Sequence, residues 1–257
     1  MLTPERFLLT GKVAVVTGAA VGIGEAIATA FARFGADVAV CDRDEPNLRA
    51  TVAVVEDAGR RSEVAVIDVR QADAVETFVG AVRDRFGRVD VLVNNAGGGF
   101  EAAFLDVNAK GQDVLVAENF TSVTLLVRAV VPLMTGGGSI VNITSIEAHR
   151  AAPGFAIYSA MKAAIASLTK SLALELGGQS IRVNCIAPDV IPTPGIGDPD
   201  EHTPLPRKGH VDDVAAAAVY LASDAAAFVT GTTIHVDGGN HAAAGWRRTD
   251  DGRFTLA

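Results

Sequence analysis

Short apolar runs and amphipathic segments alternate along most of this 257-residue chain. The runs are rich in β-branched residues, which is typical of buried strands, and the longer segments between them repeat apolar residues at helical spacing. We expect strands at 12–17, 36–41, 62–67, 89–93, 139–144, 181–186 and 232–236, and helices at 25–34, 45–58, 72–86, 112–134, 211–223 and from near Tyr158 to Leu176. This alternation predicts an α/β fold with one continuous parallel sheet and helices on both faces.

No polar or Gly/Ser-rich linker interrupts the alternation, so we expect residues 1–257 to form a single domain. Two segments stand apart. Residues 188–210 are rich in proline and follow a strand's carboxyl end, where open sheets bind ligands, so we interpret them as a substrate lid. The tail 240–257 contains the only tryptophan, Trp246, and is either a frayed end or a segment that packs on a neighbouring subunit or rims a pocket.

Composition excludes several classes of protein. The formal net charge of −8 argues against a nucleic-acid partner, which would require a basic surface. We find no apolar stretch near the roughly 18 residues that span a bilayer, and no signal-peptide pattern, so we expect a cytoplasmic protein without membrane contact. Cys41 and Cys185 fall in expected strands, which indicates buried, reduced thiols. The five histidines lack ligand spacing, so we expect no metal site.

A glycine loop follows the first strand. Gly18, Gly22 and Gly24 allow close approach of the backbone to a ligand, and the next helix begins there, so its free N–H groups would attract a pyrophosphate. Asp42 follows the second strand near the offset at which an acid binds the adenosine ribose, and it would repel a 2′-phosphate. We therefore expect NAD rather than NADP, although Arg43 could point into solvent or help accommodate a phosphate.

Tyr158 and Lys162 would lie at i and i+4 on one helix face. The ordinary pKa of a tyrosine phenol is about 10. A fixed cation nearby favours the phenolate and lowers this pKa, which allows tyrosine to transfer a proton. Ser145 follows an apolar strand upstream of this pair. Together with the glycine loop, these residues describe one enzyme site.

The chain closely resembles the classical short-chain dehydrogenase/reductase family from about Leu9 to Gly239. The matching motifs stand in the family's order: Thr17-Gly18-x-x-x-Gly22-Ile23-Gly24, Asp68-Val69, Asn94-Asn95-Ala96-Gly97, Asn119, Ser145, Tyr158-x-x-x-Lys162, Asn184-x-Ile186-Ala187-Pro188 and Val236-Asp237-Gly238-Gly239. The resemblance implies a Rossmann-type, doubly wound parallel sheet in a single dinucleotide-binding and catalytic domain, residues 1–257. It also implies a catalytic tetrad of Asn119, Ser145, Tyr158 and Lys162. In it, Tyr158 exchanges the proton, Ser145 orients the substrate oxygen, Lys162 lowers the phenol pKa and holds the nicotinamide ribose, and Asn119 anchors a water.

The resemblance also implies further cofactor contacts and an assembly. The expected cofactor-binding residues are Gly18, Gly22, Ile23, Gly24, Asp42, Asp68, Val69, Asn95, Gly97, Tyr158, Lys162, Ile191 and Thr193. A homotetramer is expected, as is common in the family. One departure is Asp189, which stands where the family usually has glycine after the proline, and we hypothesise that it helps to select the substrate.

The implied reaction is reversible hydride transfer between a nicotinamide cofactor and a small-molecule secondary alcohol or ketone. A mostly apolar set of residues is expected to face the substrate: Gly98, Phe100, Ile146, Glu147, His149, Phe155 and Ile157. This set favours a hydrophobic alcohol, such as a hydroxysteroid or terpenoid, and also fits a 3-oxoacyl or 3-hydroxyacyl thioester. A nucleotide-sensing or scaffold protein without catalysis is the alternative from another class, and the intact catalytic residues argue against it.

Overall fold

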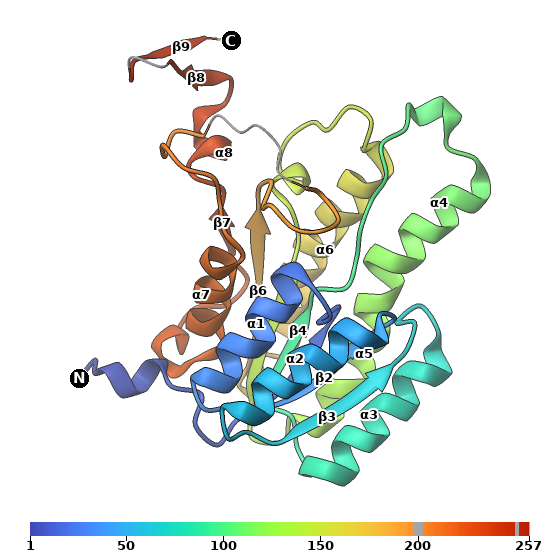
Figure 1. Cartoon of the computed structure of the whole chain (residues 1–257), viewed down its shortest axis with the longest axis vertical. Coiled ribbons are helices and arrows are strands. Elements are labelled where there is room, and N and C mark those ends of the chain that lie inside the picture. Colours follow the sequence, from blue (N-terminus) through green and yellow to red (C-terminus); the bar gives the residue numbers. More distant parts are fainter. Residues whose placement is uncertain (198–202, 250–251, 257) are drawn as a thin grey trace.

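Seven parallel strands form the central sheet in the computed structural model, which describes residues 1–197, 203–249 and 252–256 (Figure 1). The strands are β1 (Val13–Thr17), β2 (Asp37–Asp42), β3 (Ser62–Val66), β4 (Val91–Asn94), β5 (Gly138–Ile143), β6 (Ile181–Pro188) and β7 (Thr233–Val236). Their order in the sheet is β3-β2-β1-β4-β5-β6-β7. The chain therefore reverses direction across the sheet between β1 and β4, which is the position where doubly wound sheets bind ligands.

Helices cover both faces of this sheet. One face carries α1 (Gly22–Arg33), α2 (Glu45–Asp57) and α7 (Val211–Ala222), and the other carries α3 (Ala72–Phe86), α4 (Ala109–Val116), α5 (Ser122–Val130) and α6 (Ala156–Glu175). Strand residues alternate between the two cores, since Ala14 and Val16 pack under α1 and α7 while Val15 packs on the opposite side. The predicted fold class is confirmed.

Because all seven strands are parallel, their carboxyl ends lie along one edge of the sheet. That edge carries the glycine loop after β1, Asp42 at the end of β2, Asn95 after β4 and Ser145 after β5. Residues that are up to about half the chain apart in sequence thereby become neighbours. Both cysteines are buried free thiols within the strands, as expected.

The expected helix over 112–134 is longer and less regular in the structure. It begins at Ala109, where the Asn108 side chain accepts a hydrogen bond from the Gly111 N–H at 2.9 Å. A π-helical turn at Ala117–Thr121 separates α4 from α5, and a 3-10 turn at Val131–Leu133 ends the segment. Single π-turns of this kind are frequent at functional sites, and this one contains Asn119.

The same segment corrects the expectation that no stretch is apolar enough to cross a bilayer. Ala109–Leu133 is 25 residues long and has a window of mean hydropathy 1.6, so it qualifies by length and composition. Core helices of globular proteins pass this test as well. Here the segment packs on α3, α6 and β4, and Asn119, near its middle, lies at the site described below.

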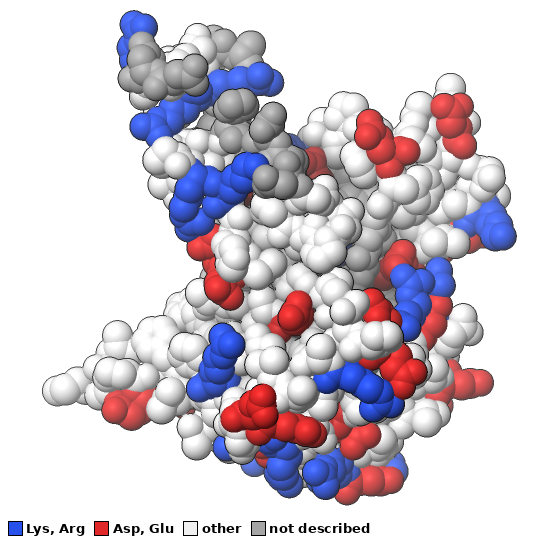
Figure 2. Space-filling view, in the orientation of Figure 1, with Lys and Arg blue, Asp and Glu red and all other residues white. Residues whose placement is uncertain are grey.

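Two segments at the same end of the molecule complete the described chain. The predicted lid continues from β6, which extends to Pro188, and its residues 198–202 lie outside the described part. The tail forms α8 (Asn240–Ala243) and an antiparallel pair, β8 (Trp246–Arg248) and β9 (Phe254–Leu256), which projects from the body (Figure 1). Blue Lys and Arg side chains gather at this projecting end, whereas both signs of charge mix over the body (Figure 2).

Candidate active site

A groove of about 660 Å³ runs along the carboxyl edge of the sheet, from the ends of β2 and β3 to the start of the lid. Its size is typical of ligand pockets. Apart from Gly24, every residue expected to bind cofactor lines it, and so do Ser145, Ile146, Glu147 and Phe155. Three residues expected to face substrate, Phe100, His149 and Ile157, are not among its described lining residues.

The glycine loop fits a ligand because its glycines leave no room for side chains. Gly18 has a φ of +64°, and a Cβ there would lie 2.9 Å from the Ala96 Cα on β4's loop. A Cβ on Gly24 would overlap the Gly18 carbonyl oxygen. Helix α1 begins at Gly22, three residues earlier than its apolar pattern predicts, so its first N–H groups belong to the loop itself. This arrangement suits a pyrophosphate.

Asn95 braces the loop from the neighbouring strand. Its side-chain amide donates to the carbonyls of Thr17 at 3.0 Å and Gly18 at 2.9 Å, and its own N–H donates to the Thr17 hydroxyl at 3.0 Å. Asn95 therefore ties β1 to β4 at the point where the sheet reverses direction. Its side chain shapes the groove as well as lining it.

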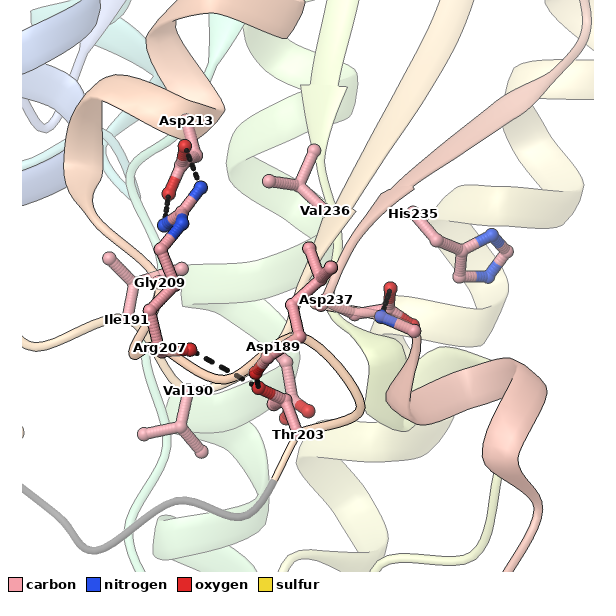
Figure 3. A pocket seen from close by; sticks show the side chains of 13 residues that line it. Asp189, Val190, Ile191, Thr203, Arg207, Gly209, Asp213, His235, Val236 and Asp237 are labelled. Atoms are coloured by element: carbon pink, nitrogen blue, oxygen red, sulfur yellow. Dashed lines mark hydrogen bonds and ion pairs between the residues drawn. The ribbon is translucent and has the colours of Figure 1, made fainter. Parts of the chain in front are cut away.

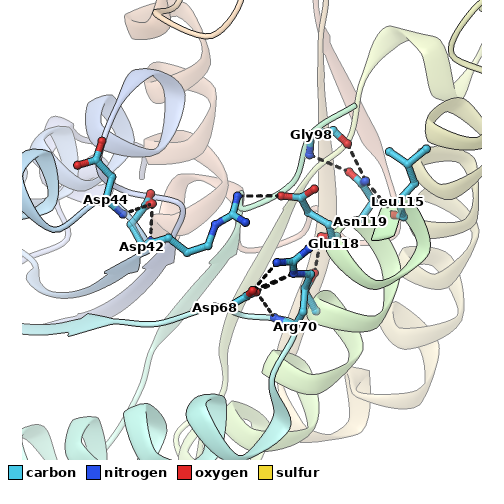
Figure 4. Close-up of polar contacts among 10 residues, drawn as sticks. Asp42, Asp44, Asp68, Arg70, Gly98, Leu115, Glu118 and Asn119 are labelled. Atoms are coloured by element: carbon cyan, nitrogen blue, oxygen red, sulfur yellow. Dashed lines mark hydrogen bonds and ion pairs between the residues drawn. The ribbon is translucent and has the colours of Figure 1, made fainter. Parts of the chain in front are cut away.

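Charged side chains converge at the end of the groove where Asp42 and Asp68 lie (Figure 4). The Asp42 carboxylate accepts hydrogen bonds from the N–H groups of Ala20, Arg43 and Asp44, at 3.0, 2.6 and 3.1 Å. The Arg43 guanidinium forms an ion pair with Glu118, at 3.3 Å. Backbone donors thus fix the Asp42 carboxylate in the groove, while the Arg43 side chain turns toward Glu118.

Asp68 forms a second ion pair at this end. Arg70 donates to both of its carboxylate oxygens, through its guanidinium and its backbone N–H, as Figure 4 shows. These hydrogen bonds hold the pKa of the Asp68 carboxyl below its ordinary value. Val69 beside it is buried and supplies an apolar wall for a planar base.

Ser145, Tyr158 and Lys162 come together at the opposite end. Ser145 follows β5, Tyr158 and Lys162 lie one turn apart on α6, and the Ser145 hydroxyl is close enough to the Tyr158 hydroxyl to lower the pKa of the phenol. The Lys162 ammonium lies 5.6 Å from the Tyr158 ring centroid and donates to the Ile143 carbonyl at 3.0 Å. An ammonium has three donors, so two remain for a ligand in the groove.

Asn119 supports the end of the groove that contains Tyr158 and Lys162. Its amide donates to the carbonyls of Gly98 at 2.8 Å and Leu115 at 3.0 Å, and its carbonyl accepts from the Gly98 N–H at 3.2 Å (Figure 4). The buried amide is therefore satisfied, as its mid-helix position requires. It holds Gly97, where a Cβ would lie 2.8 Å from the Asn119 carbonyl oxygen and 3.1 Å from the Lys162 ammonium.

Burial controls the ionisation of the catalytic pair. It lowers the pKa of Lys162 from 10.5 to about 8, and it is the largest influence that raises the pKa of Tyr158. The Ser145 hydrogen bond lowers the phenol pKa, whereas the nearby charge of Glu147 raises it further. In the protein alone the net shift of the phenol is upward, and the lowering by Lys162 that the resemblance implies stays a prediction.

The described start of the predicted lid, from Pro188, lies against the glycine loop. Ile191 is buried, and the Thr193 side chain is close enough to Gly22 that a Cβ on that glycine would lie 3.0 Å from the threonine methyl. Beyond the lid is a second cavity of about 360 Å³, bordered by Asp189, Thr203, Asp213 and the end of β7 (Figure 3). Asp189 lines both hollows.

Asp189 is not a free carboxylate. Its side chain is only 3% exposed, one oxygen accepts from the Asn240 amide at 2.6 Å, and the other pairs with Arg150 at 3.4 Å. Asp189 thereby connects the β5–α6 loop to the C-terminal segment. Its position after Pro188 predicts none of these partners, because both come from distant parts of the chain.

Three histidines form a cluster beside Asp189. The rings of His235 and His241 are stacked with centroids 4.4 Å apart, and His149 lies 4.8 and 5.8 Å from them. The Nε2 atoms of His149 and His235 are buried without a hydrogen-bond partner. Among the described residues no group of histidine, cysteine and carboxylate side chains is arranged to hold a metal ion.

This cluster makes stability dependent on pH. Burial and the neighbouring imidazoles lower the pKa values of His149 and His235 in the folded chain, whereas the unfolded histidines titrate near about 6.5. Their contribution is complete above pH about 6.5 and is lost as pH falls below it, because the unfolded state then binds more protons. We expect the melting temperature to fall from pH 7.5 to pH 5.5, with a loss of at most about 1.4 kcal/mol per pH unit per histidine.

Thermal melts of a His149→Phe variant across the same range check this expectation, since phenylalanine keeps a ring but cannot titrate. The variant should show a smaller fall than the unmodified chain. His210→Asn is the matched control, because His210 is an exposed N-cap of α7 and asparagine caps helices well. Equal falls in all three proteins would contradict the assignment to the cluster.

Sequence reasoning missed three parts of this region: the Arg43–Glu118 pair, the Arg150–Asp189–Asn240 connection and the histidine cluster. Each joins residues from separate elements whose spacing in the chain carries no signal. The π-turn was also missed, although a polar amide within an apolar helix was a usable hint of an irregularity there.

Comparison with known proteins places the chain in a family. A family model described as enoyl-(acyl carrier protein) reductase matches residues 18–241. Gluconate 5-dehydrogenase from Gluconobacter oxydans is 36% identical, with 93% of this chain and 98% of the relative covered. A 3-oxoacyl-[acyl-carrier-protein] reductase from Thermotoga maritima is 37% identical, with coverages of 90% and 98%.

Solved structures support the same family. A 7α-hydroxysteroid dehydrogenase complexed with NADH and 7-oxoglycochenodeoxycholic acid has a TM-score of 0.89 to this chain at 34% sequence identity, and the alignment covers 93% of this chain and 98% of that one. The chain belongs to the classical short-chain dehydrogenase/reductase family. It is an oxidoreductase of the nicotinamide-dependent kind that this family comprises.

Proposed function

We propose that this protein is an NAD-dependent dehydrogenase of hydrophobic secondary alcohols, acting reversibly on the corresponding ketones. The observation that carries the proposal is the convergence of Ser145, Tyr158 and Lys162 at one end of a groove whose other end presents Asp42. We further propose a cytoplasmic homotetramer. Buried free thiols support the location, and the outward Leu174 on α6, 85% exposed, supports an assembly.

In this proposal the chain's own residues manage the proton and the orientation of the substrate. Ser145 and Tyr158 hydrogen-bond the carbinol oxygen, and the Tyr158 hydroxyl exchanges the proton with it. Lys162, buried and charged below pH about 8, favours the phenolate and holds the nicotinamide ribose with its remaining donors. The cofactor, when bound, accepts or supplies the hydride.

Asn119 acts indirectly, through the residues next to the reacting atoms. Its bonds to Gly98 keep Gly97 against Lys162, so it preserves the space on which the pair depends. Residues 188–210 are proposed as the lid, with Ile191 and Thr193 next to the nicotinamide end. These positions would exclude water from the hydride-transfer step.

The preference for NAD follows from charge. The Asp42 carboxylate would accept from the ribose 2′-hydroxyl and repel a 2′-phosphate. Arg43, the one neighbour that could offset it, is engaged by Glu118. An NADH complex of the similar hydroxysteroid dehydrogenase is consistent with this preference.

Replacing Asp42 with alanine tests the preference. We expect kcat/KM with NADP relative to NAD to rise at least about tenfold, because removal of the carboxylate eliminates both the ribose acceptor and the repulsion. Initial rates with each cofactor measure the ratio. Asp44→Ala is the matched control, since Asp44 caps α2 two residues away. An unchanged ratio in Asp42→Ala would contradict the role of this carboxylate.

The substrate class is tested with a panel of secondary alcohols. The groove near Tyr158 is walled by Ile146, Phe155, Val190 and Ile191, which favours an apolar skeleton. Hydroxysteroids, terpenoid alcohols and 3-hydroxyacyl thioesters should be compared by kcat/KM. Faster turnover of the thioesters would replace the hydrophobic-alcohol assignment, and tight NADH binding without turnover of any member would favour a nucleotide sensor.

A further inference from the structure

Glu147 is a carboxylate in the wall of the groove between the two residues proposed to bind the carbinol oxygen. Its backbone N–H donates to the Ser145 hydroxyl oxygen at 3.1 Å. Its backbone carbonyl accepts from the hydroxyl of Ser159, the residue after Tyr158, at 2.7 Å. Glu147 is therefore fixed relative to both catalytic elements, which is the geometry that a recognition residue requires.

The side chain of Glu147 is held on one oxygen. Arg150 donates to Oε1 through Nη2 at 2.8 Å and through Nε at 3.3 Å. The same Nη2 of Arg150 also pairs with Asp189, at 3.4 Å. All hydrogen bonds described for the Glu147 side chain thus go to Oε1, and Oε2 retains its capacity to accept.

Apolar side chains also line the groove near this carboxylate. Ile146, the preceding residue, is buried, and Phe155 and Val190 line the same groove. The Glu147 side chain is 22% exposed, so a ligand that fills the groove would remove much of its remaining water. A carboxylate oxygen that loses water without gaining a donor is costly, so the ligand should supply one.

Glu147 also lies near the reacting oxygen. Its charge is close enough to the Tyr158 hydroxyl to raise the phenol's pKa. A donor group that bonds Glu147 would therefore belong to a part of the substrate close to the carbinol carbon. A substrate carboxylate or phosphate at this place would be repelled, and a full cation is not required because Arg150 already offsets the charge.

We infer that Glu147 is a specificity-determining residue that accepts a hydrogen bond from a second hydroxyl group on an otherwise apolar alcohol substrate. The inference rests on the proposed dehydrogenase function and narrows its substrate class to diols. Asp189 is in this view a positioning residue, which acts through Arg150. Its proximity to the groove is then explained without direct contact between Asp189 and substrate.

Matched pairs of alcohols test the inference. Cyclohexanol is compared with the 1,2-, 1,3- and 1,4-cyclohexanediols, and androstan-3-ol with androstanediols, by kcat/KM for NAD-linked oxidation. The unmodified protein should prefer at least one diol of a pair by about tenfold, the value of one good hydrogen bond to a charged group. Glu147→Met, which keeps the volume and removes both acceptors, should abolish this preference, and Glu147→Gln should restore part of it.

A second measurement separates recognition from a merely structural role. In Glu147→Gln, the acid limb of the pH profile for oxidation should move to lower pH, because loss of the negative charge lowers the phenol's pKa. NADH binding and melting temperature report whether each variant is folded. Glu175→Met, at the exposed end of α6, should change neither the diol preference nor the profile.

The outcomes are distinct. Diol preference that is lost in Glu147→Met and partly kept in Glu147→Gln supports the inference. Equal diol-to-monool ratios in the unmodified protein and Glu147→Met, with both alcohols oxidised, overturn it and leave the dehydrogenase function intact. If no alcohol is oxidised although NADH binds, the proposed function fails, and the inference falls with it.

Discussion

Replacing Tyr158 with phenylalanine is expected to lower kcat for alcohol oxidation by about 10²–10⁴-fold, the usual contribution of a positioned acid–base group. The variant loses the hydroxyl that Ser145 contacts and keeps the ring beside Lys162. NADH binding should therefore be nearly unchanged. Steady-state rates on the best alcohol of the panel, together with NADH titration, measure both quantities.

The chain provides a matched control in its only other tyrosine. Tyr220 lies on α7 and contacts Phe7, on the face of the sheet opposite α6. Tyr220→Phe likewise removes one phenolic oxygen, and it should leave kcat within about twofold of that of the unmodified protein. If Tyr158→Phe turned over as fast as Tyr220→Phe, the proposed proton transfer at Tyr158 would be wrong.

Replacing Gly24 with alanine is expected to abolish cofactor binding, with an increase in the NADH Kd of at least about 10²-fold. The new methyl group would overlap the Gly18 carbonyl oxygen and would also press on the Asn95 amide, at 2.5 Å. Because Gly18 belongs to the loop that would hold the pyrophosphate and Asn95 braces that loop, the loop must move. Overpacking of this kind also costs about 1–3 kcal/mol of stability.

Fluorescence titration with NADH and thermal melting measure the two effects. Gly178→Ala is the control, since a Cβ there meets no atom within 4 Å and its φ is not in the left-handed region. The control should bind NADH normally. Normal binding by Gly24→Ala as well would show that the loop is not the cofactor cradle.

The bounds of the helices and strands show how much of the fold the sequence predicts. The strands near 12–17 and 36–41 and the helix over 72–86 were predicted closely, because apolar periodicity reflects burial on a sheet or helix face. The boundaries of other elements differ from the prediction where tertiary contacts override the apolar pattern. Helix α1, for example, begins inside the glycine loop, which Asn95 braces through its hydrogen bond to the Gly18 carbonyl.

The candidate site divides in the same way. Spacing along one helix was sufficient to place Tyr158 next to Lys162, and parallel strands were sufficient to bring Ser145 and Asp42 to one edge. Spacing could not predict the direction of the phenol's pKa, which depends on how deeply the folded chain buries it and on the charge of Glu147. Electrostatic effects require distances that a sequence does not contain.

The sequence by itself determined the fold class, the glycine loop and the identity of the groups that could transfer a proton. Only the tertiary structure decided which side chains surround them. Arg150 is shared between Glu147 and Asp189, and Asn240 reaches Asp189 from the far end of the chain. Local patterns record each residue's burial and helical phase, whereas partners more than about one helical turn apart are chosen by the packing of whole elements.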